Sequence, residues 1–235
     1  MTESTKSLAL DTPWGIGEKK YSQILSELSS SNIERILEFG SGVSTARFGK
    51  SFPDARILSV EDHPKYYERT VELLREHNVS NASVLHCPLM RRYIGIRTYL
   101  TYALNTNFLD KEIDFVFIDG PVEAETLRGR EAPLYMAFPF IKVGGIIVLD
   151  DYHRESAKAA VRNWLKSYKA NLKIIKEYED IVVLEKCGHQ NKPAYPGIYS
   201  IMDNWYASMR LGVKAVKRFF NSLIKNAKAC CCKRP

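Results

Sequence analysis

The sequence predicts an α/β protein built on an open, mostly parallel sheet of seven strands with helices on both faces. Three observations lead to this fold class. Short apolar runs alternate with amphipathic segments along most of the 235 residues, an order typical of repeated β-α units. The first run ends in a glycine turn. The last two runs are adjacent, joined by Glu179 and Asp180, and predict an antiparallel hairpin that closes the sheet.

Seven apolar runs are the predicted strands. Each is short, and buried parallel strands typically have this apolar character. In order they cover residues 33–39, 55–60, 82–86, 113–118, 146–149, 172–178 and 181–186.

Between these runs, apolar residues recur every three or four positions and predict helices. The helices are expected over residues 18–29, 46–50, 65–77, 132–140 and 156–168. Residues 90–112 are rich in tyrosine and are the least regular part of the body, and we expect a helix over 99–104 within them. Residues 1–13 are polar and are expected to be loose.

A glycine turn follows the first strand, where residues 35–48 read RILEFGSGVSTARF. A strand, a glycine turn and a helix let a nucleotide-like ligand lie against bare backbone at the carboxyl end of a sheet. Glu61 ends the second strand roughly 20 residues beyond the turn, the distance at which ribose-binding folds place a carboxylate that accepts both ribose hydroxyls. The turn alone is equally compatible with an ordinary connection between strand and helix.

Four segments in order resemble the motifs of the class I S-adenosylmethionine-dependent methyltransferases. They read LEFGSGVST, SVEDHPKYYE, DFVFIDGP and GGIIVLDDYHR, and the resemblance covers roughly residues 14–187. It implies a Rossmann-like doubly wound sheet whose closing hairpin supplies the family's reversed seventh strand. The nicotinamide-dependent enzymes fit less well, because Arg47 and Phe48 stand where their third glycine is expected.

The resemblance also implies a cofactor site at the glycine turn. Glu38, Gly40 and Gly42 would cradle the methionine part of S-adenosylmethionine. Ser44 and Thr45 would bind its carboxylate near a helix N-terminus, where the partial positive charge of the helix favours an anion.

The adenosine part would lie along the second and third strands. Glu61 would hold the ribose hydroxyls, and Asp62 or His63 would border the adenine. His86 and Cys87 stand where the family often contacts the adenine ring.

Three aspartates follow later strands and match the pattern of the metal-dependent O-methyltransferase branch. Asp119 would contact the cofactor and take part in catalysis, and together with Asp150 and Asp151 it would bind Mg²⁺ or a similar hard cation. Such an ion would orient a substrate hydroxyl and lower its pKa. Strand-end carboxylates also cap helices, so a structural role stays open. Without a metal, His153 is the candidate general base.

The formal charge of +7 belongs to the end of the chain, because residues 203–235 hold eight basic residues against Asp203 alone. Apolar residues at spacings of three and four predict a basic amphipathic helix there. We therefore expect a methyltransferase domain over 1–187, a linker over 188–204, and the basic helix with a cysteine-rich tail over 205–235.

Three partners are open for this basic helix. It would lie on an anionic membrane surface with Cys230–Cys232 as candidate acylation sites, or dock on the body or a second subunit of a homo-oligomer. Binding to nucleic acid ranks third, because the body adds no basic patch. No apolar run is long enough to span a bilayer and the five cysteines form no disulfide framework, so we expect a cytoplasmic protein that can be peripheral to a membrane.

The expected activity is S-adenosylmethionine-dependent methylation of a hydroxyl on a small molecule or a glycan. One alternative is an aminopropyltransferase on the same fold, although Gly120, Pro121 and Val122 depart from the acidic polyamine site it would need. Another is a non-catalytic, methyltransferase-like module recruited to a membrane surface. The loops that would select the acceptor match no known pattern.

Overall fold

The computed structural model describes residues 15–95, 97–109, 111–122, 128–189, 191–192 and 209. The chain divides into two compact units, of which the first comprises residues 1–92 and 99–194. The second comprises residues 93–98 and 195–235, and most of it lies outside the described residues. The predicted linker and basic helix therefore lie almost wholly outside that part of the chain. Among the described helices, none is long and apolar enough to cross a membrane.

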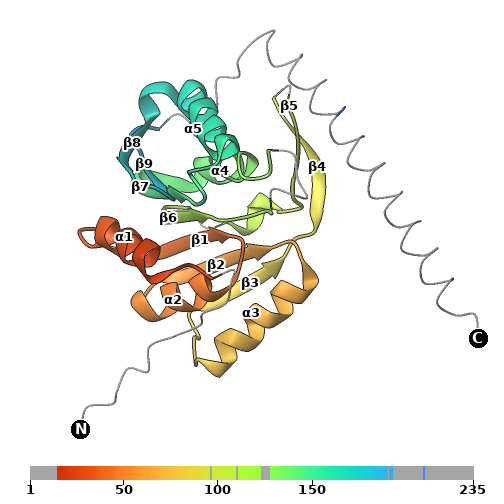
Figure 1. Ribbon diagram of the computed structural model, residues 1–235, viewed down its shortest axis with the longest axis vertical. Coiled ribbons are helices and arrows are strands. Elements are labelled where there is room, and N and C mark those ends of the chain that lie inside the picture. The colour runs from red at the N-terminus through yellow and green to blue at the C-terminus, as the bar shows by residue number, and fades with distance from the viewer. Residues whose placement is uncertain are drawn as a thin grey trace, which may run out of the picture. The chain divides into compact units, whose positions relative to one another are not determined.

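The described residues form five α-helices and nine strands (Figure 1). The helices are α1 (Glu18–Leu28), α2 (Val43–Ser51), α3 (Pro64–Glu76), α4 (Ala132–Ala137) and α5 (Glu155–Tyr168). The strands are β1 (Arg35–Phe39), β2 (Arg56–Glu61), β3 (Ala82–His86), β4 (Leu89–Ile94), β5 (Arg97–Tyr102), β6 (Ile113–Ile118), β7 (Ile141–Leu149), β8 (Leu172–Glu177) and β9 (Val182–Lys186).

Seven of the strands form one sheet in the order β3-β2-β1-β6-β7-β9-β8. Strands β3, β2, β1, β6 and β7 are parallel, and β9 runs antiparallel to both of its neighbours. The order reverses next to β1, which is where open α/β sheets bind ligands. The predicted fold class, a mostly parallel seven-stranded sheet closed by a hairpin, is confirmed.

The core lies on both faces of this sheet. Alternate side chains of β6 point to opposite faces, so Phe115 and Phe117 pack with Tyr21 and Ile24 of α1 and with Phe48 of α2. Helix α3 packs beside α2 over β2 and β3, and α4 and α5 cover the opposite face (Figure 1). All six residues of β6 are buried, as expected for a central strand between two helical layers.

The helix predicted over residues 99–104 is wrong. Residues 97–102 form strand β5, which pairs with β4 in a separate two-stranded sheet. Four of the six residues are threonine or tyrosine, and both residue types favour extended backbone. Gly95, with a φ of 60°, stands between the two strands in a conformation that suits glycine.

Lys186 is a buried cation at the end of β9. Its side chain is almost fully enclosed, and its ammonium donates to the carbonyl oxygens of Phe138 at 2.9 Å and Ile141 at 2.7 Å. It also donates to the side-chain oxygen of Asn191. Burial lowers the pKa of this ammonium, but its three acceptors satisfy the charged form. The lysine thus ties the hairpin to the segment between α4 and β7.

Replacing Lys186 with methionine is expected to lower the free energy of unfolding by about 2–4 kcal/mol, because two buried carbonyl groups would lose a charged donor. Urea denaturation measures the change. Lys158→Met is the matched control, since Lys158 is more exposed and its ion pair with Glu155 on α5 contributes little. Equal stability of the two variants would contradict a structural role for Lys186.

Candidate functional site

The carboxyl ends of the parallel strands lie level along one edge of the sheet. Phe39 is in register with Val60 of β2 and with Ile118 of β6, and Ile118 is in register with Leu149 of β7. The first residue beyond each strand continues the ladder: the amide groups of Gly40, Asp119, Asp150 and Cys87 donate to Val60, Phe39, Ile118 and Glu61, respectively. The residues predicted to form a site are therefore brought to one edge.

Glu38 of β1 holds the start of the helix that follows the glycine turn. Its side chain is fully buried, and the hydroxyl groups of Ser44 and Thr45 each donate to one of its carboxylate oxygens at 2.5 Å. The Thr45 hydroxyl oxygen in turn accepts from the amide of Gly42 at 3.0 Å. In this structure the two hydroxyl groups hold the turn against β1, and their predicted contact with a cofactor carboxylate stays a prediction.

The two glycines of the turn have different surroundings. Gly40 has a φ of +96°, and a Cβ there would lie 2.9 Å from the amide nitrogen of Gly120 in the loop after β6. Gly42 has extended backbone, and a Cβ there would meet nothing within 4 Å. Gly40 is therefore needed for the close approach of two loops, whereas Gly42 leaves bare backbone beside open space.

Glu61 is buried at the end of β2 and holds the same turn from the other side. One carboxylate oxygen accepts from the amide and the hydroxyl of Ser41 at 2.9 and 3.1 Å, and the other accepts from the amide of His63 at 3.0 Å. Thr70 of α3 hydrogen-bonds the Ser41 hydroxyl at 2.9 Å. A carboxylate has about four acceptor positions, so Glu61 keeps capacity for a further donor.

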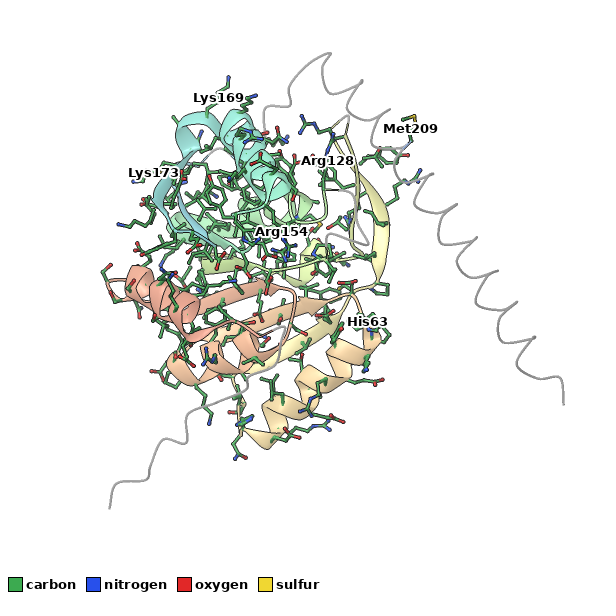
Figure 2. All side chains as sticks on the ribbon, in the orientation of Figure 1. His63, Arg128, Arg154, Lys169, Lys173 and Met209 are labelled. Atoms are coloured by element: carbon green, nitrogen blue, oxygen red, sulfur yellow. The ribbon has the colours of Figure 1, made fainter. Side chains whose placement is uncertain are left out.

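The residues predicted to border adenine lie around the start of α3 and the end of β3. His63 is the N-cap of α3, where its ring nitrogen accepts from the amide of Lys65 (Figure 2). The His86 ring packs near Tyr67 and contacts the carbonyl oxygen of Asp62 at 3.2 Å. Cys87 is buried, and burial raises the pKa of its thiol, which favours the neutral form.

Asp119, Asp150 and Asp151 converge after β6 and β7. One oxygen from each lies within 4.8 Å of the others, which is compatible with a shared cation. The cations present at this cluster belong to the protein. Lys20 of α1 contacts Asp150 at 2.5 Å, and Arg130 contacts Asp119 at 3.1 Å and Asp151 at 2.7 Å.

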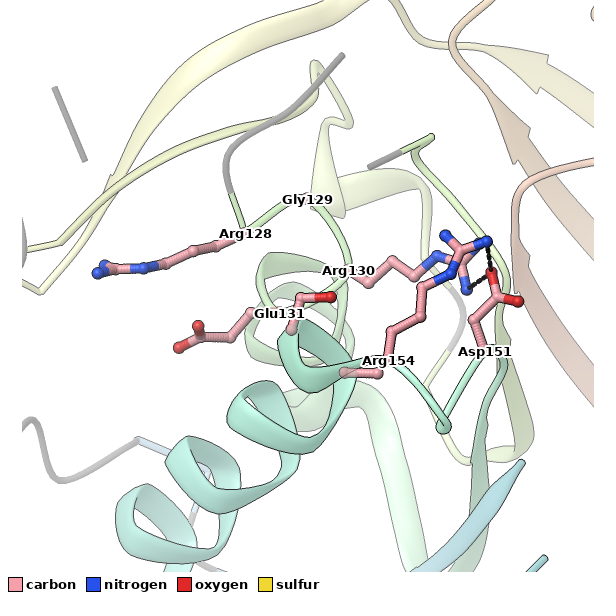
Figure 3. Close-up of a pocket in the computed structure, with 8 residues that line it drawn as sticks. Arg128, Gly129, Arg130, Glu131, Asp151 and Arg154 are labelled. Atoms are coloured by element: carbon pink, nitrogen blue, oxygen red, sulfur yellow. Dashed lines mark ion pairs between the residues drawn. The ribbon is translucent and has the colours of Figure 1, made fainter. Parts of the chain in front are cut away.

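Two arginines share Asp151. Arg154, the N-cap residue of α5, reaches the same carboxylate oxygen as Arg130 at 3.1 Å (Figure 3). Arg130 also donates to the carbonyl oxygen of Asp150 at 3.0 Å. Arg128 points away from the other two arginines in Figure 3, so the three do not form one anion-binding cluster.

The ionisation of this cluster follows from burial and from mutual contacts. Burial, with the neighbouring carboxylate of Asp150, raises the pKa of Asp119 well above its ordinary value. Burial alone would lower the pKa of Lys20 and Arg130, but the surrounding aspartates raise both. Both side chains therefore stay positively charged at neutral pH.

His153, the candidate general base, lies just beyond the cluster. About half of its side chain is exposed, and its ring nitrogen contacts the carboxylate of Asp180 at 3.0 Å, in the turn between β8 and β9. Its predicted role in catalysis stays a prediction.

Sequence reasoning did not single out Lys20 or Thr70. Lys20 stands four residues before Ile24 on the buried stripe of α1, so helical spacing could have placed it on the inward side. Tyr102 is fully buried, and its hydroxyl has no hydrogen-bond partner among the described residues; it lies 2.1 Å from where a Cβ of Gly120 would stand. The helix predicted over residues 99–104 gives no indication that Tyr102 lies next to Gly120.

Burial raises the pKa of Glu38 from an ordinary 4.5 to about 7. Between these pH values the folded state binds more protons than the unfolded state. The contribution of Glu38 to stability is therefore complete below about pH 4.5 and is lost as pH rises through about 7. Glu38→Gln stays neutral throughout, so from pH 5 to pH 8 its stability relative to the wild type should improve by about 2–3 kcal/mol.

Urea denaturation of the two proteins at both pH values measures this difference. Glu72→Gln, on the exposed face of α3, is the control and should show no such trend. A Glu38→Gln difference that is constant with pH would show that Glu38 titrates like an exposed glutamate.

Comparison with known proteins agrees with this arrangement. Residues 37–152 match a family profile described as a methyltransferase domain. No curated protein sequence matches the chain. The matched segment runs from β1 to just beyond the Asp150-Asp151 pair, so it contains the edge described above.

Solved structures with similar folds extend the comparison. A putative O-methyltransferase from Klebsiella pneumoniae has a TM-score of 0.56 at 15% identity, over 75% of this chain and 84% of that chain. An O-methyltransferase from Bacillus cereus, solved in complex with SAH, has a TM-score of 0.56 at 14% identity, over 74% and 84%. A putative rRNA-methylase from Clostridium thermocellum has a TM-score of 0.53 at 13% identity, over 72% and 96%. The chain therefore contains a methyltransferase domain, and its fold is the one found in class I S-adenosylmethionine-dependent methyltransferases.

Proposed function

We propose that this chain transfers a methyl group from S-adenosylmethionine to a hydroxyl oxygen of a small molecule or a glycan. The observation that carries the proposal is that Gly42 and Glu61 both lie at the carboxyl edge of the sheet, on either side of Ser41, which Glu61 holds. Gly42 offers bare backbone beside open space, and Glu61 is a fixed carboxylate with acceptor capacity left. These features suit the methionine part and the ribose of the cofactor, respectively. The bound cofactor supplies an activated methyl group.

The chain's own residues would act mainly by positioning. The acceptor oxygen forms a bond to the methyl carbon as the carbon–sulfur bond breaks, and the hydroxyl proton leaves to a base or to water. Holding the acceptor in line provides most of the rate gain in such a transfer. Asp119 follows β6 directly beside the close contact of Gly40 and Gly120, so it is better placed than His153 to orient an acceptor hydroxyl.

The hydroxyl acceptor is supported by two neighbours whose names describe O-methyltransferases. Another neighbour is named as a putative rRNA-methylase, so the shared fold serves more than one acceptor. The proposed hydroxyl acceptor therefore rests on the likeness to the two O-methyltransferases. Neither aminopropyl transfer nor a non-catalytic role gains a specific contact from the described residues.

Calorimetry with S-adenosylhomocysteine tests the cofactor. We expect the wild type to bind it and Glu61→Ala to bind at least about ten-fold more weakly, because a ribose hydroxyl would lose a charged acceptor. Glu72→Ala, on an exposed position of α3, should bind like the wild type. Absence of binding by a folded wild type would overturn the methyltransferase proposal.

The two glycines give a second test. Gly42→Ala should weaken binding of S-adenosylhomocysteine with little change in thermal stability, because its Cβ would enter the space assigned to the cofactor. Gly40→Ala should instead lower the free energy of unfolding by about 1–3 kcal/mol, because its backbone is strained for any other residue. Wild-type affinity in Gly42→Ala would show that the cofactor does not cross this turn.

A further inference from the structure

Two cations of the protein stand among the three aspartates that the family resemblance assigns to a metal. Lys20 reaches Asp150 from α1, and Arg130 joins Asp119 to Asp151 from the segment before α4. The contacts are largely enclosed: the side chains of Lys20 and Asp150 are 19% and 7% exposed, and that of Arg130 is 12% exposed. These pairs are therefore screened little by solvent.

The cations of the protein are enough to neutralise the cluster without a metal. Lys20, Arg130 and Arg154 carry three positive charges, and the three aspartates carry at most three negative charges, fewer where Asp119 keeps its proton. These pairs occupy one oxygen of each aspartate, so a divalent ion bound to all three would either displace Lys20 and Arg130 or bind directly beside them. Two enclosed cations would then be left beside an added dication, an arrangement that like-charge repulsion and lost solvation both disfavour. The three aspartates as arranged here do not fit a divalent cation.

We propose that Lys20 and Arg130 take the place of a divalent metal ion in this site, so that the site needs no metal. Lys20 is then a positioning residue: it neutralises Asp150 and fixes α1 over the edge of the sheet. Among the described residues, the Lys20 ammonium pairs with Asp150, so two of the three N–H groups of Lys20 stay available. These N–H groups would supply the positive charge near an acceptor oxygen. The lysine ammonium is a compact charge on a flexible side chain, so it can be directed toward that oxygen.

This inference rests on the proposed function for its relevance to methyl transfer, but its test does not. Calorimetry with Mg²⁺ and Mn²⁺ at millimolar concentrations, on the full chain at neutral pH, should show no saturable binding and no shift in melting temperature. The double variant Lys20→Gln, Arg130→Gln leaves the aspartates without their two enclosed partners. It should gain Mn²⁺ binding at least ten-fold tighter than any binding by the wild type.

Lys19→Gln with the wild-type Arg130 is the matched control, because Lys19 precedes Lys20 on α1 but is 78% exposed and pairs with Glu179. It should bind no metal. Saturable sub-millimolar binding of Mg²⁺ or Mn²⁺ by the wild type, abolished in Asp150→Asn, would overturn the proposal. The wild-type titration and the single variant Lys20→Gln carry the test if the double variant does not fold.

A separate titration with S-adenosylhomocysteine distinguishes the two proposals. Cofactor binding by the wild type that is unaffected by chelator or by added Mg²⁺ would support both. If the wild type binds neither the cofactor nor a metal, the proposed function is overturned, but the proposal that Lys20 and Arg130 replace a metal is not. Metal binding with intact cofactor binding would overturn only the substitution of a metal by Lys20 and Arg130.

Discussion

The backbone ladder that continues past the ends of the parallel strands is the constraint on which the site depends. The amides of Gly40, Asp119 and Asp150 each donate to the carbonyl oxygen of the last or next-to-last residue of the neighbouring strand. Three loops therefore leave the sheet at one level. Because these hydrogen bonds are made by backbone groups, they fix the loops whatever their side chains are. The glycine turn, the Glu61 carboxylate and the aspartate cluster occupy the positions that this ladder defines.

On that frame, each acidic side chain at the edge is held by groups of the protein itself. Glu38 receives two hydroxyl groups, and Glu61 receives the Ser41 and His63 amides. Asp150 meets Lys20. Each of these contacts restricts a buried or half-buried carboxylate to one position and so restricts the loop that carries it. The site is therefore shaped before any ligand arrives, which suits catalysis by positioning.

The aspartate cluster shows why residue type and spacing do not identify a metal site by themselves. The pattern of Asp119 with Asp150 and Asp151 predicts oxygen ligands at one edge, and the structure does bring these oxygens within 4.8 Å. The pattern says nothing of Lys20 and Arg130, which arrive from other elements. Whether a group of carboxylates takes a metal or a protein cation depends on this balance of nearby charge.

The sequence by itself determined the seven strands of the main sheet, most of the helices, the closing hairpin and the acidic residues at strand ends. These features are local, because apolar periodicity, a glycine turn and the residue that ends a strand each depend on residues close together in the sequence. Only the tertiary structure decided that Ser44 and Thr45 bond to Glu38, that residues 97–102 form a strand of a separate hairpin, and that Lys20 lies against Asp150. Those contacts depend on how distant segments pack, and no local pattern encodes which side chains then meet.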